Sequence, residues 1–365
     1  MLCANHAFKM LRLLPWLGAL LFCTLPCAVK AAAPARAAAC IQKEPVTWLS
    51  SRAELKAALE NGMSRARTPL LFHLKGSLRG QWRMLCEDNM WGEYARMCSV
   101  LYRAETGMVE LSFDYRDYVR LRAACRDENF RQSLTTAEQK LLARLESQTK
   151  ALLEPGMCVF EQLLVLHDYL VQLARYDAEG GGHVADLLDT GRGSCEAYSA
   201  TLCILLELAG IPARLVTGEA GGGPHAWNMV QLEGTWYHVD ATWDDPVLGD
   251  SGQQATSHAC FCLSDAEISR THRWNREDYP ACRGTDCYYY RRSGRYFTTF
   301  DAYWQAAMEA WRQGAFSFEG YLCQYGSPAQ FQAALQAVSH HHTPSRLSWI
   351  GPDSAAGAVI LSFGS

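Results

Sequence analysis

The sequence lacks an excess of basic residues. Its 34 lysines and arginines stand against 38 aspartates and glutamates, which gives a formal net charge of -4 at pH 7. Proteins that bind nucleic acids or anionic membrane surfaces usually carry a basic patch that reflects such an excess. We therefore expect no nucleic-acid partner.

The sequence also lacks the compositional bias of disordered and fibrous chains. Hydrophobic residues make up 49% and charged residues 20% of its 365 positions, which is typical of globular proteins. This composition leaves little room for collagen-like repeats or long disordered tracts. At roughly 150 residues per domain, we expect about two to three domains.

The cysteine content is neither very low nor very high. The chain has 15 cysteines, too few for a small scaffold held together by disulfides and more than one reactive thiol requires. The pattern around individual cysteines must therefore show which of them carries chemistry.

The first 39 residues have the order of a secretory signal. Lys9 and Arg12 precede an apolar run over 13–29, and small residues follow over 31–39. The run is short for a membrane span and contains two prolines. We predict a cleaved signal peptide over 1–39, a secreted or cell-surface protein and no stable membrane span after cleavage. A lipoprotein with Cys40 as its lipid site and an uncleaved anchor are weaker alternatives.

Two small α/β units are predicted at the ends of the mature chain. In 40–130, a capping box of Ser51 and Glu54 predicts a helix that Asn61-Gly62 ends near residue 60, followed by a strand over 70–74, a helix over 82–94 and a strand over 108–115. In 296–365, the same order recurs as helix 300–312, strand 315–321, helix 328–338 and strand 358–363. An internal duplication and two unrelated units both fit this order.

A larger unit is predicted between them, over 131–295. A second capping box, Thr135 and Glu138, opens an amphipathic helix that ends near residue 154, and another helix follows over 158–175. These helices precede the most informative stretch of the chain, residues 176–246.

Cys195 stands at the predicted start of a helix. A glycine-rich loop over 191–193 leads into Ser194, a favourable N-cap residue, and an apolar helical pattern follows. In the first helical turn, free backbone amides and the helix dipole favour a thiolate. Cys195 is therefore the candidate nucleophile.

A β-hairpin is predicted to bring a base and a carboxylate together. If Glu233-Gly234 is its turn, Leu232 pairs with Thr235 and His225 with Thr242. Asp240 then lies opposite Trp227 and on the same face as His225. This predicts a triad of Cys195, His225 and Asp240, in which His225 deprotonates the thiol and Asp240 holds the tautomer of His225. His238 shares that face and is a weaker alternative base.

These segments carry a family resemblance. The stretches GRGSCEAYSATLCILLELAGIPARLVTGE and GGPHAWNMVQLEGTWYHVDATWDDP resemble the transglutaminase-like superfamily, particularly its bacterial exported branch related to papain-like cysteine peptidases. The resemblance places Cys195, His225 and Asp240 at the catalytic positions of the family. It implies an α+β fold with a papain-like transglutaminase core, in which a helix bearing the cysteine packs on an antiparallel sheet bearing the histidine and aspartate, between the two small α/β units.

The resemblance also implies a function. A thiol attacks an amide or ester carbonyl, and the acyl-enzyme is released to water or to an amine, as in a cysteine peptidase, an amidase or a protein-glutamine acyltransferase. The implied substrate is a protein or peptide, cell-wall peptides included, and the implied chemistry needs no cofactor and no metal. We expect hydrolysis rather than cross-linking, because water is the default acceptor. The alternative is a catalytically inactive binding or scaffolding module at the cell surface.

Two chemical questions stay open at this point. The backbone amide of Cys195 is one candidate oxyanion donor, and the second is unassigned. Cys260, Cys262, Cys282 and Cys287 could together bind zinc, but their spacing is unusual, and disulfides or buried thiols are the favoured interpretation. Once the signal peptide and Cys195 are set aside, 11 cysteines remain, so at least one of them cannot pair within the chain.

Overall fold

The computed structural model describes residues 47–80, 93–248, 253–323, 327–338, 344, 346–351 and 357–364. The predicted signal peptide, the possible lipid site at Cys40 and most of the predicted helix over 82–94 lie outside these ranges. The described residues form two compact units, 47–145 and 146–365. Within these ranges every helix is too short or too polar to cross a lipid bilayer.

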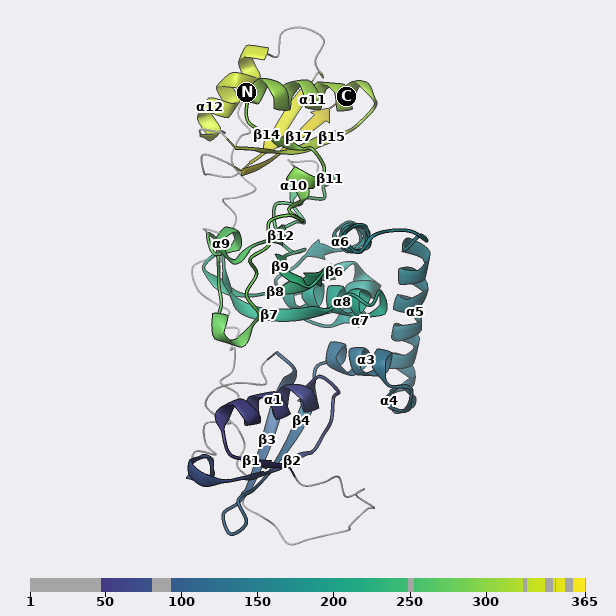
Figure 1. The fold of residues 1–365 in the computed structure, drawn as a ribbon. Helices are drawn as coiled ribbons and strands as arrows, with labels where there is room; N and C mark the ends of the chain where they lie inside the picture. The colour runs from purple at the N-terminus through teal and green to yellow at the C-terminus, as the bar shows by residue number, and fades with distance from the viewer. Residues whose placement is uncertain are drawn as a thin grey trace. The chain divides into compact units, whose positions relative to one another are not determined.

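The first unit contains a four-stranded sheet covered by one helix (Figure 1). Its elements are β1 (Thr47–Leu49), α1 (Arg52–Met63), β2 (Leu70–Leu74), β3 (Ala95–Arg103) and β4 (Met108–Tyr115). The strand order is β1-β2-β4-β3, with β1 parallel to β2 and the other pairs antiparallel. The predicted strands 70–74 and 108–115 are confirmed, whereas β3 was not predicted.

Helix α1 corrects one predicted boundary. Ser51 and Glu54 form the predicted capping box, but the helix continues through Asn61 and Gly62 instead of ending there. A Cβ at residue 62 would lie 2.6 Å from side-chain carbons of Leu70. Gly62 therefore allows the helix to approach strand β2 closely, and its role is packing rather than termination.

Helices connect this sheet to the second unit. They are α3 (Asp117–Arg126), α4 (Glu128–Gln132), α5 (Thr136–Leu152) and α6 (Val159–Leu173). Thr135 and Glu138 exchange the hydrogen bonds of the predicted capping box at the start of α5. The two long helices predicted in this region are thus confirmed.

The second unit is built around a five-stranded antiparallel sheet in the order β12-β9-β8-β7-β13. The strands are β7 (Ala213–Ala220), β8 (Gly223–Leu232), β9 (Thr235–Val239), β12 (Phe261–Leu263) and β13 (His272–Arg273). Helix α8 (Cys195–Leu208) packs against β7, β8 and α6, and its residues 197–206 are all buried. The predicted α+β class, with the cysteine-bearing helix on an antiparallel sheet, is confirmed.

The hairpin of β8 and β9 has the predicted register near its turn. Leu232 pairs with Thr235, and pairing continues to Asn228 and Val239. Glu233 and Gly234 both have positive φ, as a two-residue hairpin turn requires. The prediction that His225 pairs with Thr242 is wrong, because β9 ends at Val239. The chain turns there, and the amide of Asp240 donates instead to the carbonyl of Cys260, at 3.0 Å.

A second four-stranded sheet completes this unit. Its elements are β14 (Tyr296–Phe297), α11 (Phe300–Arg312), β15 (Ser317–Leu322), α12 (Pro328–Val338), β16 (Arg346–Ile350) and β17 (Gly357–Gly364). The strand order β14-β15-β17-β16, with only the first pair parallel, is the order and direction found in the first unit. The two end regions therefore share one topology, although their edge strands were not predicted.

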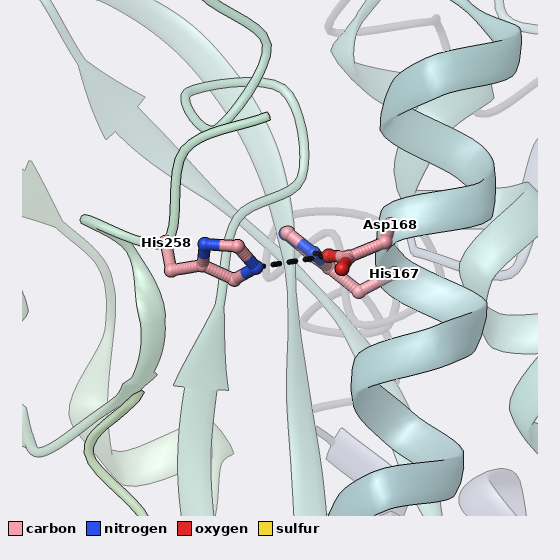
Figure 2. Close-up of side chains that lie close together, drawn as sticks. All are labelled: His167, Asp168 and His258. Atoms are coloured by element: carbon pink, nitrogen blue, oxygen red, sulfur yellow. Dashed lines mark hydrogen bonds and ion pairs between the residues drawn. The ribbon is translucent and has the colours of Figure 1, made fainter. Parts of the chain in front are cut away.

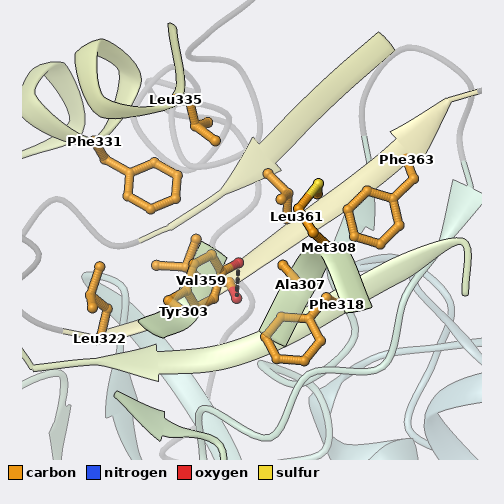
Figure 3. Packing of buried hydrophobic residues seen from close by; sticks show 10 residues of the cluster. All are labelled: Tyr303, Ala307, Met308, Phe318, Leu322, Phe331, Leu335, Val359, Leu361 and Phe363. Carbon is orange, nitrogen blue, oxygen red and sulfur yellow. Dashed lines mark hydrogen bonds between the residues drawn. The ribbon is translucent and has the colours of Figure 1, made fainter. Parts of the chain in front are cut away.

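Helices α11 and α12 pack on this sheet through a compact apolar core (Figure 3). Tyr303 of α11 and Phe331 of α12 are almost fully buried against Val359 and Leu361 of β17. The hydroxyl of Tyr303 also donates to the carbonyl of Val359, at 3.3 Å. The sheet thus has its own core, but it lies in the same compact unit as α8 and β8. The domain boundaries at 130 and 295 stay predictions.

Candidate active site

Cys195 is the first residue of α8, as predicted, and its side chain is partly exposed. The preceding loop approaches the helix closely, because a Cβ on Gly193 would lie 2.8 Å from the Cβ of Ala197. Ser194 occupies the N-cap position with extended backbone, but its hydroxyl donates to the carbonyl of Gly181, at 2.8 Å. The predicted N-cap position of Ser194 is confirmed, but its hydroxyl does not accept from the first amides of α8, which stay without that side-chain acceptor.

His225 links the thiol to a carboxylate. Its Nε2 lies 2.7 Å from Oδ2 of Asp240, and Cys195 lies close enough to its ring to contribute to the raised pKa of His225. Because Nε2 contacts Asp240, Nδ1 is the ring nitrogen that remains for the thiol of Cys195. His225 is 6% exposed and Asp240 is fully buried. The structure thus brings together all three residues that the sequence singled out.

Asp240 is held by four donors. Its Oδ1 accepts the backbone amides of Thr242 and Trp243, at 3.0 and 3.2 Å. Its Oδ2 accepts from His225 and also from Nε2 of His272, at 2.9 Å. The turn that ends β9 early therefore supplies the amides that orient the carboxylate toward the two imidazoles.

His272 was not predicted from the sequence. It lies on β13, which is only two residues long and pairs with β7, so no periodic pattern marks it. The ring is fully buried, and its Nδ1 contacts the Thr271 hydroxyl at 2.8 Å. It contacts Asp240 from strand β13 and completes the carboxylate's set of donors.

Electrostatics favour an ion pair in this site. Burial opposes the charge of His225, but Asp240 and Cys195 outweigh it and raise the pKa of His225 to about 10. Burial likewise opposes the charge of Asp240, but His225 and His272 hold the pKa of Asp240 well below its usual range. In the reactive form of such a site, a protonated imidazole lies between a nucleophilic thiolate and a carboxylate.

Tyr176 is a second residue that the sequence did not reveal. It lies on β5 (Arg175–Tyr176), which pairs with β6 (Arg192–Gly193) directly before Cys195. Its side chain is 47% exposed. Burial of the phenol, with a contribution from the charge of Cys195, raises the pKa of Tyr176. Tyr176 therefore offers a neutral hydroxyl from a strand that pairs with Gly193, two residues before Cys195.

His238 uses both ring nitrogens elsewhere. Its Nδ1 accepts from Nε1 of Trp227 at 2.9 Å, and its Nε2 lies 2.9 Å from Oδ1 of Asp265. Because the indole N–H only donates, His238 is the neutral tautomer with its proton on Nε2. Burial accordingly lowers the pKa of His238. This leaves neither nitrogen for Cys195, which argues against His238 as the base.

The four cysteines considered for zinc do not converge. Cys260, Cys262, Cys282 and Cys287 are all buried free thiols. Among the described residues, the clusters of metal-ligating side chains include Cys282 with His238 and Asp265, but none contains two of these cysteines. The four-thiolate alternative is therefore wrong in this structure.

The profile of the Transglutaminase-like superfamily matches residues 146–241, a range that contains Cys195, His225 and Asp240. This segment is a transglutaminase-like core. The family assignment agrees with the resemblance noted in the sequence.

Curated relatives share this core. The segment is similar to the Kyphoscoliosis peptidase of Homo sapiens, with 36% identity over 75 residues, which are 17% of this chain and 11% of that protein. It is also similar to the Protein-glutamine gamma-glutamyltransferase of Pseudomonas aeruginosa, with 32% identity over 121 residues, or 28% of this chain and 18% of that protein. The chain thus spans less than a fifth of either relative.

Solved structures are also similar to this chain. One is the periplasmic domain of TgpA from Pseudomonas aeruginosa bound to ethylmercury, with 22% identity and a TM-score of 0.25, which covers 37% of this chain and 55% of that one. Another is a TGase, with 17% identity and a TM-score of 0.26, which covers 48% of this chain and 51% of that one.

Proposed function

We propose that this protein is an exported enzyme that forms a covalent acyl-enzyme on Cys195 from amide substrates in proteins or peptides. The observation that supports this most strongly is the chain of contacts from Cys195 through His225 to the buried Asp240. In such an arrangement the imidazole takes the proton of the thiol and later gives it to the leaving amine. Export is inferred from the sequence pattern of residues 1–39.

The first half-reaction forms a thioester. With the thiol proton on Nδ1 of His225, the sulfur of Cys195 attacks the carbonyl carbon, a C–S bond forms and the carbonyl electron pair moves to oxygen. Collapse of this tetrahedral species breaks the C–N bond, and the imidazolium of His225 gives its proton to the leaving amine. Asp240 stays ionised throughout and holds the ring in place.

The second half-reaction releases the acyl group. Water enters, His225 takes one of its protons as the oxygen attacks the thioester, and the C–S bond breaks. The products are a free acid, with the thiolate of Cys195 and the imidazolium of His225 regenerated. A primary amine in place of water gives a new amide, so hydrolysis and transamidation share one intermediate. We favour hydrolysis, because water needs no binding site of its own.

The oxyanion of both tetrahedral species requires donors. The backbone amide of Cys195, in the first turn of α8, is one. We assign the hydroxyl of Tyr176 as the second, since it lies close to the thiol and is held neutral by its surroundings. This assignment fills the position that the sequence left open.

The proposal is tested with a limiting amount of an alkylating reagent and peptide mapping by mass spectrometry. We expect Cys195 to be the first thiol labelled and His225→Gln to slow its labelling about 100-fold. Cys158, which is exposed, provides the matched control: Cys158→Ala should label like the parent. If Cys195→Ala labels as strongly as the parent, the nucleophile is a different residue.

A second measurement separates an enzyme from a silent module. Secreted peptides and cell-wall fragments are incubated with the parent and with Cys195→Ala, in the presence and absence of a labelled primary amine. Peptide cleavage or amide hydrolysis that requires Cys195 supports hydrolysis, and amine incorporation that requires Cys195 supports acyl transfer. A protein that labels at Cys195 yet converts nothing in either assay is a binding module.

A further inference from the structure

A second cluster of ionisable side chains lies outside the triad. His167 and Asp168 point from helix α6 toward His258, which lies in the segment before β12 (Figure 2). Oδ1 of Asp168 is 2.9 Å from Nδ1 of His167 and 3.0 Å from Nε2 of His258. The three ligand atoms lie within 4.8 Å of one another. None of these residues takes part in the chemistry proposed for Cys195.

A carboxylate lies behind each imidazole. The remaining nitrogen of His167, Nε2, is 3.2 Å from Oδ2 of Asp244. The remaining nitrogen of His258, Nδ1, is 2.7 Å from Oε2 of Glu319. Histidines that bind metal ions almost always direct their other ring nitrogen at a carboxylate, a carbonyl or water, which sets the tautomer and strengthens the ligand. Both histidines of this cluster have that arrangement.

The carboxylates behind the imidazoles are themselves held in place. Oδ1 of Asp244 accepts the backbone amide of Cys260, at 2.8 Å. Oε1 of Glu319 accepts the hydroxyl of Tyr290, at 2.6 Å, and the backbone amide of His258, at 2.7 Å. These bonds leave each carboxylate with one oxygen directed at its imidazole. The two carboxylates that orient the imidazoles are therefore already held in position without an ion.

The cluster has more acidic groups than basic ones. Three carboxylates, Asp168, Asp244 and Glu319, surround two imidazoles, and four of these five residues are at most 7% exposed at the side chain. Within the described part of the chain, the ion pairs of these carboxylates are all with His167 and His258 and none is with lysine or arginine. When the two imidazoles bind a metal ion they are neutral ligands, and the three carboxylates then place three negative charges around it in a low-dielectric setting, which a divalent cation partly compensates.

The spacing of the three ligand atoms also suits a metal ion. Bonds of about 2.0 to 2.2 Å in a tetrahedral site place ligand atoms roughly 3.4 Å apart. Two of the three separations, 2.9 and 3.0 Å, need to widen by only a few tenths of an ångström, and the third, between the two imidazole nitrogens, is at most 4.8 Å. Asp168 is 31% exposed at its side chain, so the site is open to solvent on that side and a water molecule can provide a further ligand.

We propose that His167, Asp168 and His258 bind a divalent first-row transition metal ion, with Asp244 and Glu319 orienting the two imidazoles. Two nitrogen ligands and one carboxylate oxygen suit zinc and its neighbours, whereas calcium and magnesium prefer all-oxygen sites. The ion would join helix α6 to the segment before β12, which carries His258, and Glu319 would link His258 to strand β15. This inference does not depend on the proposed acyl-enzyme chemistry.

Another cluster, different from the proposed site, is a weaker candidate for the same ion. His238, Asp265 and Cys282 also converge, but Trp227 donates to Nδ1 of His238 and so places the proton on Nε2, the nitrogen that faces Asp265. A metal ion at Nε2 would have to displace that proton and the bond to Asp265. His238→Gln is therefore the matched control for substitutions in the proposed site.

The test measures zinc binding to the full chain after chelator treatment. All proteins carry Cys195→Ser, because a thiolate beside an imidazole is itself a zinc ligand pair. The protein with this change alone is the parent in this test. We expect isothermal titration with zinc chloride, together with elemental analysis after gel filtration, to give about one bound ion per chain. His258→Gln and Asp168→Asn should each weaken zinc binding at least tenfold, whereas His238→Gln should not. Magnesium chloride should give no binding heat.

Two further readouts keep the proposal falsifiable if a variant folds poorly. Cobalt bound by the parent should show visible d–d absorption without the near-ultraviolet band of a cobalt–thiolate bond, because the proposed ligands contain no sulfur. At a hundredfold excess over Kd, zinc should raise the Tm of the parent by about 5 °C and leave that of His258→Gln unchanged. Absence of zinc binding by the parent, full retention by His258→Gln, or a thiolate band would each overturn the proposal.

Discussion

Two histidine clusters in this protein share one motif and differ in what surrounds it. In each, a single carboxylate oxygen lies between two imidazoles: Oδ2 of Asp240 contacts His225 and His272 at 2.7 and 2.9 Å, and Oδ1 of Asp168 contacts His167 and His258 at 2.9 and 3.0 Å. The same acid–base pair of residue types therefore occurs twice within one compact unit.

The outer nitrogens make the difference. Beyond His225 lies the thiol of Cys195, whereas carboxylates lie beyond both His167 and His258. A nucleophile next to an imidazole makes a reactive pair, and carboxylates next to two imidazoles make an anionic shell suited to a cation. The comparison teaches that the partner of the second nitrogen decides the chemistry of a histidine.

One turn connects the two clusters. Asp240 and Asp244 lie at its two ends, and the amide of Asp244 donates to the carbonyl of Asp240, at 3.1 Å. The amide of Cys260 donates to Asp244, and its carbonyl accepts from the amide of Asp240. The clusters are thus mechanically linked even though their proposed roles are separate.

The largest expected difference between the clusters is in turnover. Asp240→Asn removes the charge that holds the imidazolium of His225 and should lower kcat about 10⁴-fold on any substrate found for the parent. Asp168→Asn makes the same chemical change in the other cluster. The factor by which it lowers kcat should be at least ten times smaller than that of Asp240→Asn. Steady-state kinetics measure both, with the exposed Asp301→Asn as the control. Equal losses at Asp240 and Asp168 would show that the clusters act as one site.

The next largest effect concerns the oxyanion. Tyr176→Phe removes only a hydroxyl and should lower kcat about 100-fold, because one donor to the tetrahedral oxygen is lost. The rate of Cys195 alkylation should stay within about twofold of the parent, since alkylation forms no oxyanion. Parallel measurement of turnover and alkylation checks this split. A matching fall in both rates would assign Tyr176 to thiol activation instead.

The charge on His225 provides a prediction about pH. Its pKa of about 10 exceeds the usual value of about 6.5, so the folded state binds this proton more tightly than the unfolded state does. The resulting stabilisation is fully present below pH 6.5 and is lost as the pH rises through 10. In Asp240→Asn, NMR titration should show the pKa of His225 falling by at least two units. An unchanged pKa would mean that Asp240 does not set this charge.

The smallest expected effect is at His272. It touches Asp240 but not the thiol, so we treat it as a positioning residue. His272→Ala should lower kcat about tenfold, and His272→Gln, whose amide can still donate to Asp240, should recover most of that loss. Kinetics and Tm are measured together for both variants. A loss that follows Tm alone and is not recovered by glutamine would indicate a purely structural role.

The residues of the triad were predictable because each lies next to a strong local signal. Cys195 follows a glycine-rich loop and opens an apolar helix. His225 lies on one arm of a hairpin whose turn is Glu233-Gly234, and Asp240 directly follows the other arm. Local backbone preferences decide such features, so they can be read from neighbouring residues. The exact end of β9 could not be read in this way, because it depends on a backbone hydrogen bond between Asp240 and the distant Cys260.

The other residues of the site come from distant parts of the chain. His272 and Asp240 are 32 positions apart, and His258 and Glu319 are 61 positions apart. Tyr176 approaches the segment before Cys195 only because β5 pairs with β6. Their strands are short or their segments irregular, so no pattern of hydrophobic residues marks them. The edge strands β1 and β14 are only three and two residues long and were missed for the same reason.

The sequence by itself determined the transglutaminase-like core, its antiparallel hairpin and the candidate residues Cys195, His225 and Asp240, because helix starts and hairpin turns are set by neighbouring residues. Only the tertiary structure decided which nitrogen of His225 faces the thiol, that His272 shares Asp240, and that His167, Asp168 and His258 form a second cluster. The physical reason is that a hydrogen bond between distant residues depends on how helices and sheets pack, and packing is a property of the whole fold.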